Sequence, residues 1–181
     1  IENKRHFQGF SYIYNYDSKG RLVSSLNQPK NGSNWELDTL IYSKKGVLLK
    51  SLTYNQDGKE VKRNEYKYKK KKLIVEDYIL DGKPHVKSIY SYDRKRNRKT
   101  VSRAFKGRPQ GTWIYQMDKD GRLLVFYMYN SVGEIISTQK FKYNSDGLEI
   151  EQRVLNKDNE LGQFYTTTYD PRGLVDYKES W

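Results

Sequence analysis

Large side chains recur along this chain at intervals of 24 to 26 residues. They stand at Tyr16, Tyr42, Tyr68, Tyr92, Met117, Tyr143 and Tyr169, and most of them follow another large side chain two residues earlier. Residues two apart share one face of a β-strand but not of a helix. A period of this length is typical of tandem supersecondary units that bury their apolar faces against one another. The sequence therefore predicts a repeat protein built from strands.

Two turn signals divide each repeat into two strands. The first is a glycine four residues after the large side chain, and it recurs at Gly20, Gly46, Gly121, Gly147 and Gly173. In four of these turns Asp or Asn opens the turn, Ser43 opens the one that ends at Gly46, and Gly takes the positive-φ position that closes it. The second signal follows at Asn31-Gly32, Asp57-Gly58, Asp81-Gly82, Lys106-Gly107, Val132-Gly133 and Asp158-Asn159. Seven copies then predict about fourteen strands of about seven to nine residues, joined by hairpins.

We therefore predict an all-β fold in which tandem β-hairpin repeats form one long, twisted antiparallel meander sheet, open or curled. It would be a single elongated repeat domain over residues 1–181. With about 4.8 Å between strands, the sheet would extend about 65 Å and could not stay flat. Twelve of the seventeen tyrosines share one parity of the first strand in each repeat, which predicts one tyrosine-rich face. Leu123-Leu124-Val125-Phe126 is apolar on both parities, so part of the sheet is expected to be covered on both faces.

Several strings resemble known hairpin repeats. Tyr14-x-Tyr16-Asp17-x-x-Gly20-Arg21-Leu22 and Asp118-x-x-Gly121-Arg122-Leu123 resemble the YD repeat of the RHS and teneurin families. Gly107-x-x-x-Gly111-Thr112-Trp113-x-Tyr115 is similar to the MORN-type repeats of bacterial surface and antitoxin-like proteins. Together these resemblances cover nearly the whole chain, although the spacing is a few residues longer than in YD repeats. They imply a secreted or envelope-associated bacterial scaffold without enzymatic residues of its own.

The residue types needed for catalysis or metal binding are scarce. His6 and His85 are the only histidines, and neither lies near a nucleophile motif or a carboxylate pair with metal-ligand spacing. The chain has no cysteine, which excludes disulfides and thiolate metal sites. Most Asp residues occupy turns, where the side chain caps backbone amides. We expect no enzymatic activity, no cofactor and no metal. The apolar runs are also too short for a transmembrane segment.

The net charge of +12 is concentrated in the middle of the chain. Residues 59–108 hold eighteen Lys and Arg against six Asp and Glu, and the remaining residues hold sixteen of each sign. Two consecutive copies of the repeat carry cations in place of the turn glycine. The first copy has Lys69, Lys70, Lys71 and Lys72, and the second has Arg94, Lys95, Arg96, Arg98 and Lys99. In a meander these turns would form a row at one end of the sheet, which Lys19, Arg21, Lys44 and Lys45 would continue. Turns about 10 Å apart could follow a phosphate backbone, a lipopolysaccharide head group or a sulfated glycan. The alternative is a solvated edge that prevents aggregation of sheets.

Trp35 and Trp113 are tryptophans in a chain whose aromatic residues are mostly tyrosine. Their rings could either stack on sugars or pack within the sheet. The leading functional hypothesis is a non-enzymatic binding protein of the bacterial cell envelope or exterior. It would present an extended sheet to a protein or to a polyanionic or glycan surface component, with nucleic acid a less favoured partner. The alternative is an intracellular antitoxin-like or immunity-like module that binds nucleic acid or an acidic protein through its basic centre. The chain begins at Ile1 rather than Met, which indicates an excised or processed chain.

Overall fold

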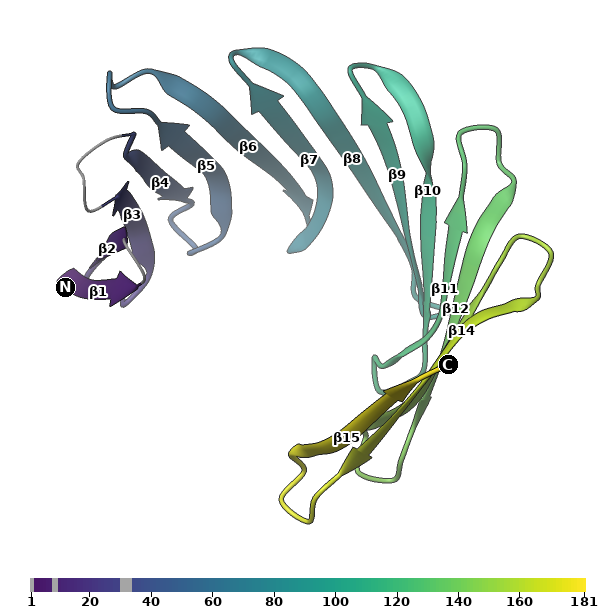
Figure 1. Cartoon of the computed structure of the whole chain (residues 1–181). Coiled ribbons are helices and arrows are strands. Elements are labelled where there is room, and N and C mark those ends of the chain that lie inside the picture. Colours follow the sequence, from purple (N-terminus) through teal and green to yellow (C-terminus); the bar gives the residue numbers. More distant parts are fainter. Residues whose placement is uncertain (1, 8–9, 30–33) are drawn as a thin grey trace. The chain divides into compact units, whose positions relative to one another are not determined.

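The structure is a computed structural model that describes residues 2–7, 10–29 and 34–181. The predicted Asn31-Gly32 turn lies outside the described residues. Those that are described form fifteen antiparallel strands and no helix, and the order of strands in the sheet follows the sequence (Figure 1). The all-β meander predicted from the repeat is thus confirmed. The number of strands exceeds the predicted fourteen because a short strand, β1, pairs with β2.

The chain divides into two units, residues 1–88 with 105–107 and residues 89–104 with 108–181. The first unit contains β1 (Glu2–Phe7), β2 (Phe10–Tyr16), β3 (Leu22–Pro29), β4 (Glu36–Tyr42), β5 (Leu48–Tyr54), β6 (Glu60–Lys69), β7 (Lys72–Leu80) and the beginning of β8 (Lys83–Asp93). The second unit contains the end of β8, most of β9 (Arg98–Phe105), β10 (Arg108–Met117), β11 (Leu123–Tyr129), β12 (Ile135–Tyr143), β13 (Glu149–Leu155), β14 (Leu161–Tyr169) and β15 (Val175–Ser180). Each unit is described by itself below.

The predicted turns form because local polar groups close them. Asp17 Oδ1 accepts hydrogen bonds from the backbone N–H groups of Lys19 and Arg21, at 2.8 and 3.0 Å. Gly20 follows with a φ of 73°, a conformation that costs glycine little. The same arrangement recurs at Asp118 in the second unit, whose Oδ1 accepts from Arg122 N at 2.9 Å. These are hairpins with a type I turn followed by a left-handed residue.

Six of the seven large side chains of the period mark a β-bulge. The strand register shifts by one at Tyr16, Tyr42 and Tyr68 in the first unit, and at Met117, Tyr143 and Tyr169 in the second. A bulge places two residues of one strand against one of its partner. At five of these positions the bulge leads into a five-residue turn, and at Tyr68 it precedes the two-residue turn of Lys70 and Lys71.

The strand registers confirm the predicted aromatic face. In the first unit they place Tyr14, Leu40 and Tyr66 on one face of the sheet. In the second unit Tyr115, Phe141 and Tyr165 share a face in the same way. The large positions at the start of each repeat therefore stack across neighbouring hairpins.

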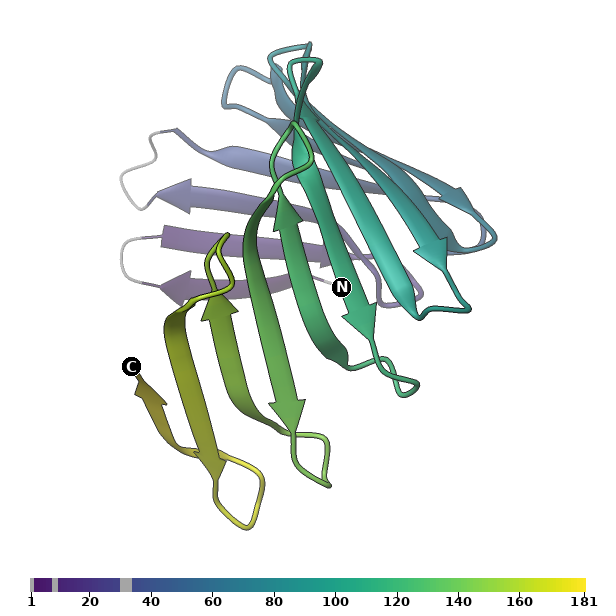
Figure 2. The ribbon, with the colours of Figure 1, turned by 90° about the vertical axis from the view of Figure 1, so that its right-hand side faces the viewer.

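Within each unit the sheet is a single layer. No other described element of the same unit covers either face of its strands, as the hairpins of the second unit show (Figure 2). The apolar side chains that are buried, among the residues described, are Leu52, Val101 and Leu155. Most other side chains are half-buried. Tyrosine suits such positions, because its broad ring can pack on the sheet while its hydroxyl remains polar and accessible. No cover is seen over the doubly apolar strand β11, where Leu124 is 37% exposed.

Candidate functional site

Three successive hairpin turns of the first unit carry exposed lysines at the same end of their strands. The turns join β2 to β3, β4 to β5 and β6 to β7, and neighbouring turns are two strands apart, or about 10 Å. We call the exposed lysines of these turns the lysine row: Lys19, Lys44, Lys45, Lys69, Lys70 and Lys71. The sequence predicted this alignment, and the strand order within the unit provides it.

The turns themselves direct these side chains outward. In the β4–β5 turn, Ser43 N donates to the carbonyl of Val47 at 2.8 Å, and Gly46 N donates to the carbonyl of Ser43 at 2.9 Å. These bonds satisfy the polar backbone of the turn and leave Lys44 and Lys45 at its tip. The lysine side chains there contact solvent and are not needed to close the turn.

The β6–β7 turn is tighter and less favourable for its residues. Lys70 and Lys71 both have positive φ, 49° and 64°, in a two-residue turn between Lys69 and Lys72. This mirror-image turn favours Asn-Gly because a side chain with a Cβ is disfavoured at positive φ. Two lysines in these positions cost about 1 kcal/mol each. The turn thus retains two lysines at positions where asparagine and glycine would be less strained.

The lysine row has no neutralising partners. Over residues 2–7, 10–29 and 34–181, none of its six lysines forms an ion pair with a carboxylate. Arg21, beside the row, does: its Nε lies 2.7 Å from Asp17 Oδ2, and its guanidinium stacks over the Tyr42 ring at 4.8 Å. Arg21 is therefore used to hold the turn, whereas the lysines leave a positive potential at this end of the sheet.

The second cationic turn belongs to the second unit and is partly used for structure. Asp93 Oδ1 accepts hydrogen bonds from the backbone N–H groups of Lys95 and Arg96, and Arg96 Nε lies 3.8 Å from Asp93 Oδ2. Lys99 covers the Tyr115 ring with its Nζ 4.0 Å from the ring centroid. Arg94 and Lys95 are exposed at the turn, and Arg98 is half-buried at the start of β9. Of the predicted binding residues here, Lys99 has a packing role.

Neither tryptophan proposed as a stacking platform has an open ring at the tip of a turn. Trp113 lies on β10, half-buried, with the guanidinium of Arg103 4.7 Å from its ring. Trp35 is half-buried immediately before β4. The contact of Trp113 with Arg103 is a cation–π interaction within the sheet, so this ring packs.

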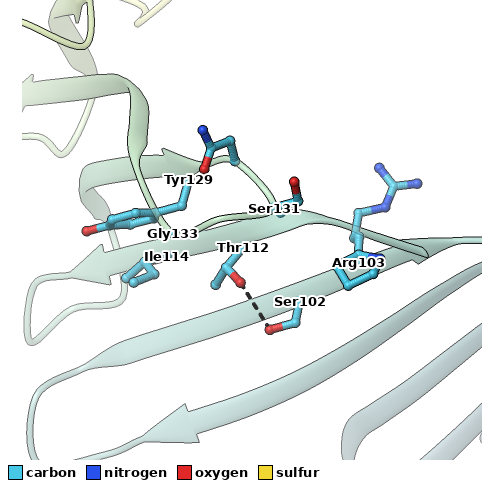
Figure 3. A pocket seen from close by; sticks show the side chains of 10 residues that line it. Ser102, Arg103, Thr112, Ile114, Tyr129, Ser131 and Gly133 are labelled. Carbon is cyan, nitrogen blue, oxygen red and sulfur yellow. Dashed lines mark hydrogen bonds between the residues drawn. The ribbon is translucent and has the colours of Figure 1, made fainter. Parts of the chain in front are cut away.

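The second unit has a hollow that sequence reasoning missed (Figure 3). It has a volume of about 320 Å³ and lies between β9, β10 and the β11–β12 turn; its lining residues are Ser102, Arg103, Pro109, Gly111, Thr112, Ile114, Tyr129, Asn130, Ser131 and Gly133. Ser102 Oγ and Thr112 Oγ1 are 3.3 Å apart within it. Gly111 belongs to the MORN-like string, but nothing in that string indicated that a hollow would form beside it.

His85 and several turn carboxylates have structural partners, whereas the side chain of His6 lies outside the described part of the structure. His85 lies between the rings of Tyr78 and Phe105, with centroid distances of 5.5 and 4.7 Å. Hydrogen bonds from Arg21 lower the pKa of Asp17, and hydrogen bonds from Arg172 lower that of Asp170. No group of three or more potential metal-ligating side chains occurs in the part of the chain that the structure describes. The same part contains no helix able to cross a membrane.

No family model and no curated protein matches the chain. Among solved structures, it is similar to the crystal structure of TcdB2-TccC3, with a TM-score of 0.54 and 16% identity over 93% of this chain. It also matches the structure of TcdB2-TccC3-Cdc42, with a TM-score of 0.49 and 14% identity over 90% of this chain. A third match is a porin-like protein from Bacteroides uniformis, with a TM-score of 0.43 and 9% identity over 99% of this chain and 93% of that one. This chain spans 10% of the length of each of the first two. The first likeness shows the fold, and it agrees with a YD-repeat-like, repeat-type scaffold.

Proposed function

We propose that this protein is a non-enzymatic repeat scaffold of the bacterial cell envelope or exterior that binds a polyanionic glycan along the lysine row. The observation that carries the proposal is the row itself: at three alternate turns, which share one end of the first unit's sheet, six exposed lysines have no ion-pair partner among the described residues. A linear polyanion lying across the hairpin ends would meet a cationic turn about every 10 Å. Its binding would be electrostatic and would weaken as salt rises.

The scaffold part of the proposal is supported by how the charged side chains are used. Asp17, Asp118 and Asp170 each accept hydrogen bonds from backbone amides and from a nearby arginine. These carboxylates stabilise turns and are not gathered for acid–base chemistry. A location at the cell envelope or exterior is supported by the YD-repeat and MORN resemblance of the sequence.

The lysine row is poorly placed for protection against aggregation. Protective lysines lie along the outer strand of a sheet, where they prevent another strand from pairing. The lysines of the row lie at turns between β2 and β7, which are paired with neighbours on both sides. The cost of placing lysine at two positive-φ positions also favours a role that needs charge at that turn.

Retention on heparin, a sulfated glycan, tests the proposal. The row variant Lys44→Gln, Lys45→Gln, Lys69→Gln loses three charges without altering the strained pair. The control variant Lys119→Gln, Lys140→Gln, Lys157→Gln loses three charges from exposed lysines of the second unit. We expect the row variant to elute from heparin at clearly lower salt than the control, because each contact with the polymer contributes to the salt dependence.

Elution of both variants at the same salt concentration would reject the lysine row as a binding site. A parallel column of duplex DNA separates the proposal from its intracellular alternative. If row-dependent retention occurred on DNA and was absent on heparin, the glycan proposal would fail and the nucleic-acid alternative would replace it.

A further inference from the structure

The hollow of the second unit has the chemistry of a small binding site, separate from the lysine row. Its open space of about 320 Å³ is at the lower end of the range for small-molecule sites. Neutral side chains dominate its lining, with hydroxyl groups from Ser102, Thr112 and Ser131 and apolar surface from Ile114 and Tyr129. A hollow of this composition suits a ligand that is neutral and has both polar and apolar surface.

The hydroxyl pair at the base of the hollow has unused hydrogen-bonding capacity. Ser102 Oγ and Thr112 Oγ1 are 3.3 Å apart, and one donates to the other. Each hydroxyl has one donor and two acceptor positions, so the pair keeps one donor and three acceptor positions. Figure 3 shows both oxygens between neighbouring strands at one side of the hollow. A ligand hydroxyl at this point could both donate and accept.

An aromatic side chain, Tyr129, shares a face of the sheet with the hydroxyl pair, and its ring lies near Ile114 (Figure 3). Thr112 pairs directly with Tyr129 across β10 and β11, so their side chains share a face of the sheet. Tyr127 continues this face, with its ring centroid 6.4 Å from that of Tyr129. Two tyrosine rings on the face that carries the hydroxyl pair provide a broad apolar surface with polar groups at its margin.

The one cation at the hollow does not serve it. The guanidinium of Arg103 stacks on Trp113, 4.7 Å from the ring, and Figure 3 shows the Arg103 side chain extending away from the hydroxyl pair. Asn130 is also engaged, because its Oδ1 accepts from the amides of Val132 and Glu134. The groups left for a ligand are hydroxyls and rings, which excludes charge recognition as the basis of binding.

Gly111 lines the hollow where its backbone lies close to that of Tyr129. Its φ is 153°, and a Cβ at this position would lie 2.2 Å from the carbonyl oxygen of Tyr129. Glycine thus allows β10 to approach the end of β11 more closely than any other residue could. This close approach joins two strands whose residues line the hollow.

We infer that this hollow binds a neutral pyranose sugar ring, with hydroxyls bonded to Ser102 and Thr112 and an apolar face against Tyr129. A pyranose has the required combination of hydroxyls at its margin and C–H groups on its faces. The site would select neutral sugars, in contrast to the lysine row, so the two proposals can fail independently.

Saturation-transfer NMR with cellotetraose, maltotetraose and chitotetraose at millimolar concentration tests this inference. We expect at least one of these neutral oligosaccharides to bind, and we expect Thr112→Val and Tyr129→Ala to weaken its binding about tenfold, the loss of one hydrogen bond or ring contact. The matched controls are Thr167→Val and Tyr177→Ala on β14 and β15, which lie outside the hollow. Circular dichroism melting of each variant confirms that it folds.

The result that would overturn the inference is the absence of saturation transfer to all three oligosaccharides with the unaltered protein. Equal weakening by the hollow variants and their controls would also reject it. If a heparin hexasaccharide bound in a Thr112-dependent manner while the neutral sugars did not, the site would recognise charge and the inference would be wrong.

Discussion

Among single residues, the tyrosines of the 26-residue period do more than fill one face. Each of three hydroxyls donates to a backbone carbonyl twenty residues earlier: Tyr42 to Leu22 at 2.9 Å, Tyr143 to Leu123 at 2.8 Å and Tyr169 to Glu149 at 2.7 Å. The acceptor belongs to the first residue of a strand in the preceding hairpin. Tyrosine therefore links adjacent repeats through both its ring and its hydroxyl. Met117 occupies the same position without a donor.

We expect Tyr143→Phe to destabilise the protein by about 1 kcal/mol, because the Leu123 carbonyl loses its hydrogen bond while the ring is retained. The measurement is urea unfolding. Tyr177→Phe is the control, since that side chain is 58% exposed. Equal stability of the two variants would mean that the hydroxyl link contributes nothing.

Gly111→Ala should cost at least about 2 kcal/mol, since the new Cβ meets the Tyr129 carbonyl at a backbone conformation that alanine rarely adopts. Gly162→Ala is the matched control in the same unit. Its Cβ would lie 3.6 Å from the carbonyl oxygen of Val154, an ordinary contact, and its φ is not in the left-handed range. The measurement is thermal melting. Equal melting temperatures of the two variants would contradict the close backbone approach at Gly111.

Hairpins are the elements that make this fold, and most of their described turns are of two kinds, although Ser43 opens the β4–β5 turn. Turns opened by Asp or Asn use that side chain to cap the backbone, as Asn55 Oδ1 does for the amides of Asp57 and Lys59. Two-residue turns use two positive-φ residues, as in Asp81-Gly82 and Lys106-Gly107. Lys70-Lys71 belongs to the second kind but lacks a glycine.

Lys70→Asn with Lys71→Gly should therefore stabilise the protein by about 1 kcal/mol, because Asn-Gly suits both positive-φ positions. Differential scanning calorimetry measures the gain. Lys44→Asn with Lys45→Gly removes the same charge from residues that are not at positive φ, and it should give no gain. If both pairs raised the melting temperature equally, relief of charge repulsion would be the cause, and the strain argument would fail.

For the whole molecule, the single-layer sheet spreads stability over many half-buried side chains. The solvent-accessible surface is 12785 Å², and within the described ranges no large side chain is less than 2% exposed. Contacts join neighbouring hairpins within each unit, as in other repeat proteins. Charged turn residues and partly buried tyrosines therefore have a large share in the dependence of stability on pH.

Stability should decline on acidification as the turn aspartates are protonated. The pKa of Asp17 is lowered by hydrogen bonds from the Arg21 side chain and backbone, and Asp170 behaves similarly with Arg172. A lowered folded-state pKa gives a contribution that is complete above the ordinary value of 3.8 and is lost as pH falls through the folded-state value. Melting temperatures across the acid range measure this. In the Asp17→Asn variant the melting temperature should fall less steeply as the pH is lowered. If the fall were as steep as in the unaltered protein, protonation of Asp17 would not be a cause of the acid destabilisation.

Stability should also decline at alkaline pH. Burial raises the pKa of Tyr66 and Tyr115, because a phenolate is disfavoured away from water. A raised folded-state pKa gives a contribution that is complete below the ordinary value of 10.0 and is lost as pH rises through the folded-state value. Ultraviolet titration of phenolate absorbance should coincide with loss of the circular dichroism signal. Ionisation of all tyrosines well before unfolding would contradict this prediction.

The period of the tyrosines and the turn glycines was enough to predict the hairpins, the order of strands and the shared face of the large side chains. These features depend on local chemistry: alternation along a strand, Asp capping a turn and glycine at positive φ. The placement of the lysine row followed from the same logic, because every second turn lies at the same end of a meander. The bulge at each large position was not predicted, since a one-residue shift depends on how two strands fit each other.

The three-dimensional structure was needed for every contact between side chains distant in sequence. The tyrosine hydroxyls reach carbonyls of the preceding hairpin, Arg103 covers Trp113, and Ser102 and Thr112 meet at the base of the hollow. Each of these depends on strand register, and a slip of one residue would move the side chain to the opposite face of the sheet. Composition identifies which residues could bind a partner, but register determines which of them are left free to do so.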